Sequence, residues 1–157
     1  MDSTDPAATI RIVAGVLAVA VVVAMLLVAI FYVLTLSRAL EKCSARSRTM
    51  QPGMVWLLFI PLFNMVWHFF VVLALARSLS NEFRARNVQN VEPEPGKSIG
   101  IAMCICGACA IVPLLNIVAG LAQLVLGIIY WNRIAGFSRK LDSVPAMSAG
   151  SNLAPRA

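Results

Sequence analysis

The sequence predicts an all-α integral membrane protein without a soluble domain. Of its 157 residues 60% are apolar and only 13% are charged, and the mean hydropathy is +0.84, all far from the values of soluble proteins. Three long uncharged runs are separated by basic loops. We therefore expect one helical membrane domain over residues 12–142 with about four membrane helices, preceded by an N-terminal segment, residues 1–11, and followed by a disordered tail, residues 143–157.

The first uncharged run, residues 12–36, predicts a spanning helix. Its 25 residues would extend roughly 37 Å as a helix, against about 30 Å for the hydrocarbon core of a bilayer. The run is too long for a signal peptide, and Asp2 and Asp5 stand where a basic cluster would be. We expect an uncleaved anchor. Its alanines at a spacing of four, such as Ala14 and Ala18, favour close packing with a helix of this chain, of a second copy or of another membrane protein.

The second membrane segment is expected over residues 53–79, and the third uncharged run covers residues 98–132. As one straight helix the 35 residues of the third run would measure roughly 52 Å, which is too long even for a strongly tilted span. Pro113 lies near its middle, and proline removes a helix hydrogen bond and clashes with the preceding turn. The third run therefore predicts a helical hairpin.

The pattern around this proline occurs twice. Residues 60–66 (IPLFNMV) and residues 112–118 (VPLLNIV) form a short internal repeat, in which Pro61 and Pro113 break the helix and an asparagine follows three residues later. Proline presets φ and asparagine can bond the backbone groups freed by the break, so the pair suits a tight turn. At Pro61 two interpretations stay open, namely a kink within a single span and the tip of a re-entrant hairpin.

The basic residues predict an orientation. Arg11 alone of the 13 Lys and Arg precedes the first span, and the other twelve lie in the two loops and after the last helix. If both prolines mark hairpin tips, these twelve share one face, whereas a single crossing by the second segment divides the basic residues 9 to 4. The positive-inside rule favours the first arrangement. We expect a multi-pass protein of the inner (plasma) membrane with cytoplasmic basic loops.

Few polar residues lie at membrane depth. Asn64, Asn116 and His68 are the candidate ligand-binding residues. None of the three long apolar runs contains an Asp or a Glu. The absence of buried acids disfavours proton relays, ion pumps and intramembrane acid catalysis. A lone histidine cannot build a metal site, and the cysteines of the CxCxxC at residues 104–109 would point apart on a helix. We therefore expect no metal, no cofactor and no catalytic residue.

The basic stretch after the second segment predicts contact with the membrane surface. Arg77, Arg84 and Arg86 are the candidates for binding lipid head groups, since each basic residue near an anionic surface gains about 1 kcal/mol. Glu82 precedes Arg86 by four residues and can pair with it on a helix. The basic residues form no patch interleaved with aromatic residues, so anionic lipids are the expected partner and nucleic acid is not.

Residues 50–57 (MQPGMVWL), residues 60–67 and residues 78–86 carry a family resemblance. Together they resemble an uncharacterised bacterial family of multi-span membrane proteins with a PGxVWLxxIPLFNxxW…SLxxEFxxR segment. Residues 128–138 are similar to the end of the same group, so the resemblance covers about residues 48–141. It implies a multi-helix bacterial membrane protein containing a domain of unknown function, and it implies no catalytic residues.

These observations give one leading function and two alternatives. We expect a non-enzymatic membrane protein that acts through protein or lipid partners, because buried acids are absent. A small transporter or channel-like protein is the alternative, since paired broken helices also build substrate sites near the bilayer midplane. A lipid-modifying membrane enzyme is the third interpretation, for which the sequence offers only His68 and loop residues such as Glu41 and Arg84. The ligand, the partner and the oligomeric state stay open.

Overall fold

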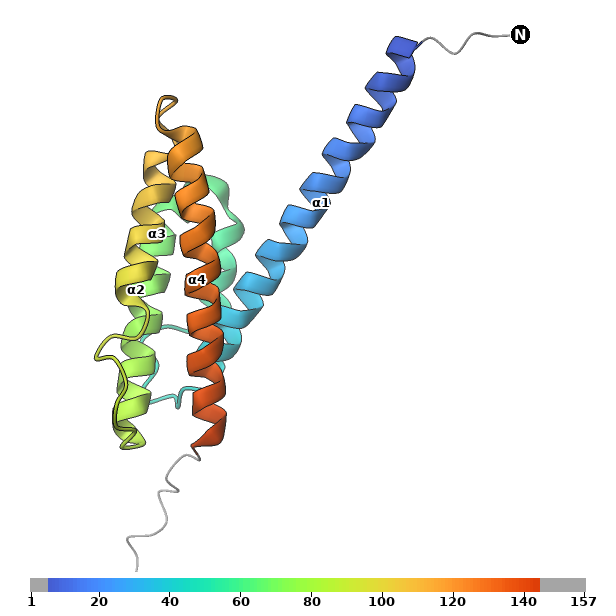
Figure 1. Cartoon of the computed structure of the whole chain (residues 1–157). Helices are drawn as coiled ribbons and strands as arrows, with labels where there is room; N and C mark the ends of the chain where they lie inside the picture. The colour runs from blue at the N-terminus through green and yellow to red at the C-terminus, as the bar shows by residue number, and fades with distance from the viewer. Residues whose placement is uncertain (1–5, 145–157) are drawn as a thin grey trace, which may run out of the picture. The chain divides into compact units, whose positions relative to one another are not determined.

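The computed structural model describes residues 6–144, without the side chains of residues 61 and 62. Over this range the chain is helical and contains no strand. The elements in order are α1 (Pro6–Glu41), the 3-10 helix η1 (Pro52–Phe59), α2 (Pro61–Ala85), α3 (Lys97–Cys109) and α4 (Asn116–Ser143) (Figure 1). The predicted all-α class without a soluble domain is confirmed. From residue 145 on, the predicted tail lies outside the described residues.

The chain divides into two compact units, residues 1–34 and residues 35–157. In the first unit the structure describes one continuous stretch of α1, which begins at Pro6, six residues before the expected start. Proline suits this position because the first helical N–H groups have no partner within the helix. The large apolar side chains from Ile10 to Phe31 are exposed around the whole circumference. A helix that is apolar all round is typical of a membrane span.

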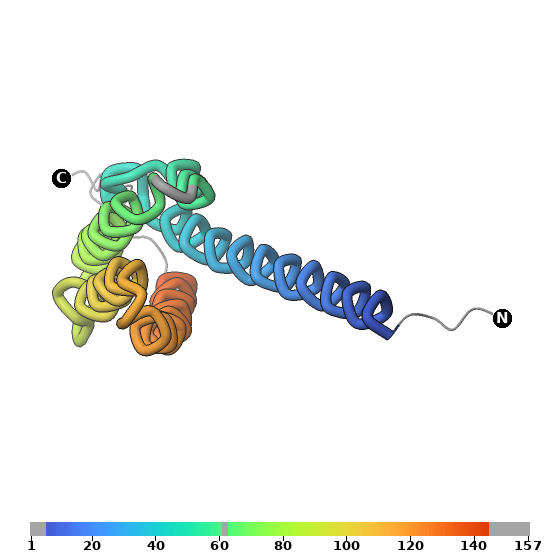
Figure 2. The backbone as a smooth tube through the Cα atoms, turned by 90° about the horizontal axis from the view of Figure 1, so that it is seen from above, coloured from blue at the N-terminus to red at the C-terminus, as the bar shows by residue number. Residues whose placement is uncertain are grey.

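The second unit contains two hairpins, and η1 and α2 form the first. Ile60 is extended, with φ −85° and ψ 108°, and the chain reverses there. The indole Nε1 of Trp67 on α2 donates a hydrogen bond of 2.9 Å to the carbonyl of Met54 on η1, so the short helix packs back along the long one (Figure 2). In the structure the break at Pro61 is thus a reversal of the chain and not a kink within one straight helix.

Helices α3 and α4 form the second hairpin, closed by a turn over residues 110–115 that contains Pro113. At Gly100 of α3, side chains of both α2 and α4 come close to the helix backbone. A Cβ added there would lie 2.5 Å from Cγ1 of Val72 and 2.9 Å from Cε2 of Tyr130. The hairpin differs from its predicted bounds, residues 98–132, because α4 continues to Ser143. Its polar last turns pack within the unit, where Ile134 and Leu141 are buried.

Three helices of the described part of the chain are long and apolar enough to cross a membrane. They are Pro6–Glu41, Phe63–Ala85 and Asn116–Ser143. With 13 residues α3 measures about 20 Å, less than the thickness of the hydrocarbon core. Where about four membrane helices were expected, the described residues contain three long apolar helices and one shorter apolar helix.

Packing is uneven along the second unit. Fully buried leucines lie in the last turns of α1 and in α2, namely Leu36, Leu40, Leu75 and Leu79. At the turn between α3 and α4 and in the first turn of α4 the apolar side chains are instead exposed, with Leu114 94% and Ile117 77% accessible. One end of the unit is thus a packed core, and the opposite end presents apolar surface.

Candidate functional site

Helices α2, α3 and α4 surround a small cavity of about 70 Å³. We call it the inner cavity. Asn64 and His68 of α2, Cys104 and Gly107 of α3, and Gln123 of α4 line it. Asn64 and His68 are four residues apart, so both lie on the same face of α2. The structure thus brings together two of the three predicted ligand-binding residues.

Gln123 is the residue of the inner cavity that the sequence candidates omitted. Its side chain lies against Gly107, where an added Cβ would be only 2.8 Å from Gln123 Nε2. The missing side chain of Gly107 therefore makes room for the amide. In the sequence Gln123 is visible as a polar amide within the uncharged run at residues 98–132. The sequence does not indicate that this side chain lines the same cavity as Asn64.

Asn64 brings a buried acceptor to the inner cavity. Its side-chain Oδ1 is buried without a hydrogen-bond partner, while its backbone N–H donates to the carbonyl of Ile60 at 2.7 Å. The side chain of Asn64 was expected to bond backbone groups freed by the break, and its Oδ1 does not do so. A buried carbonyl oxygen without a donor costs about 1–3 kcal/mol. The cavity therefore offers an unused acceptor to a small polar guest.

Asn116 lies elsewhere. It is the first residue of α4 and is exposed, and it does not line the inner cavity. The two motifs differ because α2 begins at its proline whereas α4 begins three residues after its proline. Asn64 therefore lies one turn inside a helix, and Asn116 lies at a helix end. The repeated sequence pattern produces two chain reversals but only one residue at the cavity.

A second polar group, which we call the polar end cluster, joins three segments at the other end of the unit. The carboxylate of Glu82 is only 2% accessible and accepts hydrogen bonds of 2.8 Å from the backbone N–H and the hydroxyl of Ser44. Its other oxygen pairs with Nε of Arg86 at 2.8 Å. The predicted pairing of Glu82 with Arg86 is therefore present.

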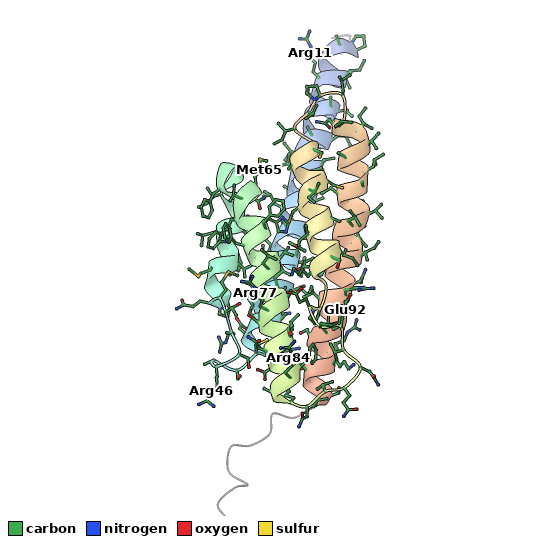
Figure 3. The ribbon with its side chains drawn as sticks, turned by 90° about the vertical axis from the view of Figure 1, so that its left-hand side faces the viewer. Arg11, Arg46, Met65, Arg77, Arg84 and Glu92 are labelled. Carbon is green, nitrogen blue, oxygen red and sulfur yellow. The ribbon has the colours of Figure 1, made fainter. Side chains whose placement is uncertain are left out.

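The other two nitrogens of the Arg86 guanidinium also have hydrogen-bond partners within the polar end cluster. It donates hydrogen bonds to three backbone carbonyls, those of Lys42, Leu141 and Val144. Arg86 thus ties the end of α4 to the loop after α1, and these donors are used within the protein. Of the three arginines predicted to contact head groups, Arg77 and Arg84 are the exposed ones (Figure 3).

All four cysteines are free thiols, one in the loop after α1 and three on α3. Cys104 is buried on α3, while Cys106 and Cys109 are partly exposed, as expected for residues on different faces of a helix. Among residues 6–144 no group of three or more His, Cys, Asp or Glu side chains could hold a metal ion. Burial, helped by the nearby charge of Glu82, raises the pKa of the Cys43 thiol to about 12. Cys43 is therefore a protonated, packed side chain.

The fold and these two polar groups define a small all-helical protein with three membrane-span-like helices. The chain belongs to the family described as "Domain of unknown function (DUF4328)", whose model matches residues 2–100. The resemblance to an uncharacterised family is thereby confirmed. The matched region includes α1, η1 and α2, whereas α4 and residues 128–138 lie beyond it.

Other comparisons add no relative. No curated protein matches the chain, and no solved structure matches it.

Proposed function

We propose that the protein is a non-enzymatic, multi-pass protein of the inner membrane that acts through lipid or protein partners. The observation that carries the proposal is the apolar surface of α1. The 18 most apolar consecutive residues of this helix have a mean hydropathy of 3.1, and only 6% of them are buried. Such a surface is stable in hydrocarbon or against other membrane helices. In water, copies of it would associate with one another.

The polar end cluster supports an orientation. Through Arg86 it holds together the loop after α1, the end of α2 and the end of α4, so the basic residues of all three segments lie at one end of the second unit. This arrangement favours the version in which twelve basic residues share the cytoplasmic face. The exposed apolar turn at Leu114 then lies toward the opposite side of the bilayer.

Labelling of single cysteines in oriented inner-membrane vesicles tests this proposal. Native Cys43 is buried and cannot serve as the reporter of its loop. The exposed positions Ala45 and Gln89 are suitable, so Ala45→Cys and Gln89→Cys are each made in a chain whose four native cysteines are alanine. We expect an impermeant maleimide to label both from the cytoplasmic side.

The matched control is Asn116→Cys, at the exposed turn of the second hairpin. We expect it to resist reagent added from the cytoplasmic side. Labelling of Ala45→Cys and Gln89→Cys from opposite sides would contradict the orientation, because α2 would then cross the bilayer between them. Release of the protein by carbonate washing would contradict membrane integration itself.

The inner cavity favours one alternative, a small transporter or channel-like protein. It combines an unused acceptor, a histidine and an amide within the apolar part of the second unit. In liposomes a flux that passes the cavity should be lost in Asn64→Ala and kept in Asn116→Ala, because only Asn64 lines the cavity. Equal fluxes in both variants would exclude a pathway through the inner cavity.

A further inference from the structure

We propose that the loop before η1 binds the phosphate of an anionic phospholipid head group. The site is a hollow of about 510 Å³, open on one side, that we call the loop hollow. It is lined by residues 45 and 48–53, none of which is acidic. The proposal rests on the membrane location proposed above, and it assigns a specific site that the exposed arginines of α2 do not form.

Arg48 is the side chain that carries this assignment. Its Nε is buried without a hydrogen-bond partner, and none of the ion pairs within residues 6–144 includes its guanidinium. Arg86 contacts the same loop at Lys42, but its guanidinium has partners, namely the carboxylate of Glu82 and three backbone carbonyls. A buried charged donor without an acceptor is costly. A phosphate oxygen supplies the missing acceptor and matches the planar fork of donors that arginine presents.

The loop hollow lies at the depth expected for head groups. Thr49, in its lining, donates its backbone N–H to Oγ of Ser78 at 3.0 Å and its hydroxyl to the carbonyl of Ala74 at 2.8 Å. These two contacts lie on either side of Arg77, the first charged residue after the uncharged part of α2 (Figure 3). The hollow is therefore held at the level where the protein surface changes from apolar to charged.

A lipid fits the surroundings of the loop hollow better than a free phosphate ion. Helix η1 leads away from the hollow toward the apolar part of the unit, and its Met54 and Trp56 are 40% and 44% accessible. Exposed tryptophan is typical of the membrane interface. A ligand with a phosphate at Arg48 can thus lay its acyl chains along these exposed apolar side chains, which a soluble ion cannot use.

Native mass spectrometry of the full chain in neutral detergent micelles tests the site. The probe is dioleoyl phosphatidylglycerol, and dioleoylglycerol, which lacks the phosphate, is the reference lipid. We expect preferential binding of phosphatidylglycerol, and Arg48→Gln should weaken it about tenfold, as expected for the loss of a charge-assisted hydrogen bond. Arg46→Gln removes the same charge from an exposed position in the same loop and should change the affinity by less than about twofold.

A second variant keeps the test independent of the stability of Arg48→Gln. An added Cβ at Gly53 meets nothing within 4 Å, so Gly53→Asp introduces a negative charge into the lining without a clash. It should weaken phosphatidylglycerol binding about tenfold through like-charge repulsion, with an unchanged melting temperature in lipid-free micelles.

Three results would overturn the proposal. They are undiminished binding in Arg48→Gln or Gly53→Asp, equal losses in Arg46→Gln and Arg48→Gln, and full displacement of the lipid by millimolar inorganic phosphate, which would make the hollow a site for the free ion. Each of them leaves the labelling pattern of the vesicles untouched, so failure of the site is distinguishable from failure of the proposed membrane orientation.

Discussion

The polar end cluster and the inner cavity both gather buried polar side chains from separate segments, but they differ in how completely those side chains are paired. Glu82 accepts from Ser44 and Arg86, and Arg86 donates to three further carbonyls. Asn64 at the inner cavity has a buried oxygen without a partner. The first arrangement is a closed network, and the second has unused hydrogen-bonding capacity.

This difference separates structure from candidate function. A fully paired network fixes the positions of the segments that it joins, and removing one member leaves the others buried and unpaired. A partly paired group contributes less to stability, and it is the kind of place where a small guest gains a hydrogen bond. The two groups should therefore respond to substitution in opposite directions.

The largest effect is expected at the polar end cluster. Glu82→Leu should lower the free energy of unfolding by about 3–5 kcal/mol, because it leaves the buried guanidinium of Arg86 without its anion. Glu41→Leu, at an exposed position, is the control and should have a small effect. Unfolding by sodium dodecyl sulfate from neutral micelles measures both. A difference below about 1 kcal/mol would show that the cluster is not a closed network.

The next largest effect is expected at the helix contact between the two polar groups. Gly100→Ala should destabilise the unit by about 1–3 kcal/mol, since its new Cβ would press on Val72 and Tyr130. Gly120→Ala on α4 meets nothing within 4 Å, and it should be neutral or stabilise by up to about 1 kcal/mol through helix propensity. The same unfolding assay compares them, and equal effects would contradict the close approach of α2, α3 and α4.

A smaller effect of opposite sign is expected at the inner cavity. Asn64→Leu removes a buried unpaired oxygen, and its larger side chain can extend into the inner cavity. The substitution should stabilise the protein by about 1 kcal/mol in lipid-free micelles. Asn116→Leu, exposed at the turn, is the matched control. Destabilisation by Asn64→Leu as large as that by Glu82→Leu would mean that both polar groups are closed networks.

The smallest effect on stability near neutral pH is expected at Cys43, beside the polar end cluster. The thiolate is the reactive form, and in the folded protein the pKa of this thiol is raised to about 12. At pH 8 maleimide labelling of Cys43 should thus be at least about tenfold slower than that of Ala45→Cys. Because the thiol of the unfolded chain ionises first, stability should fall between about pH 9 and pH 12. Cys43→Ala should remove that part of the decline.

Several features of the fold follow from the amino-acid order alone. The lengths of the uncharged runs require helices, since only helices satisfy their own backbone groups in hydrocarbon. Pro113 requires a break in a run that is too long to span. The pairing of Glu82 with Arg86 follows from their spacing of four on a helix. These inferences depend on local geometry, which neighbouring residues set.

The sequence left other features open, and the tertiary structure decided them. Pro61 is compatible with a kink or a reversal, and the contact of Trp67 with η1 selects the reversal. Two asparagines share one motif, but of the two only Asn64 lines the inner cavity, together with Gln123 from a helix far along the chain. Likewise, Arg86 joins separate segments through its hydrogen bonds, while Nε of Arg48 stays without an acceptor. Such outcomes depend on which segments pack together, and contacts between residues far apart in the chain cannot be derived from the local periodicity of one sequence.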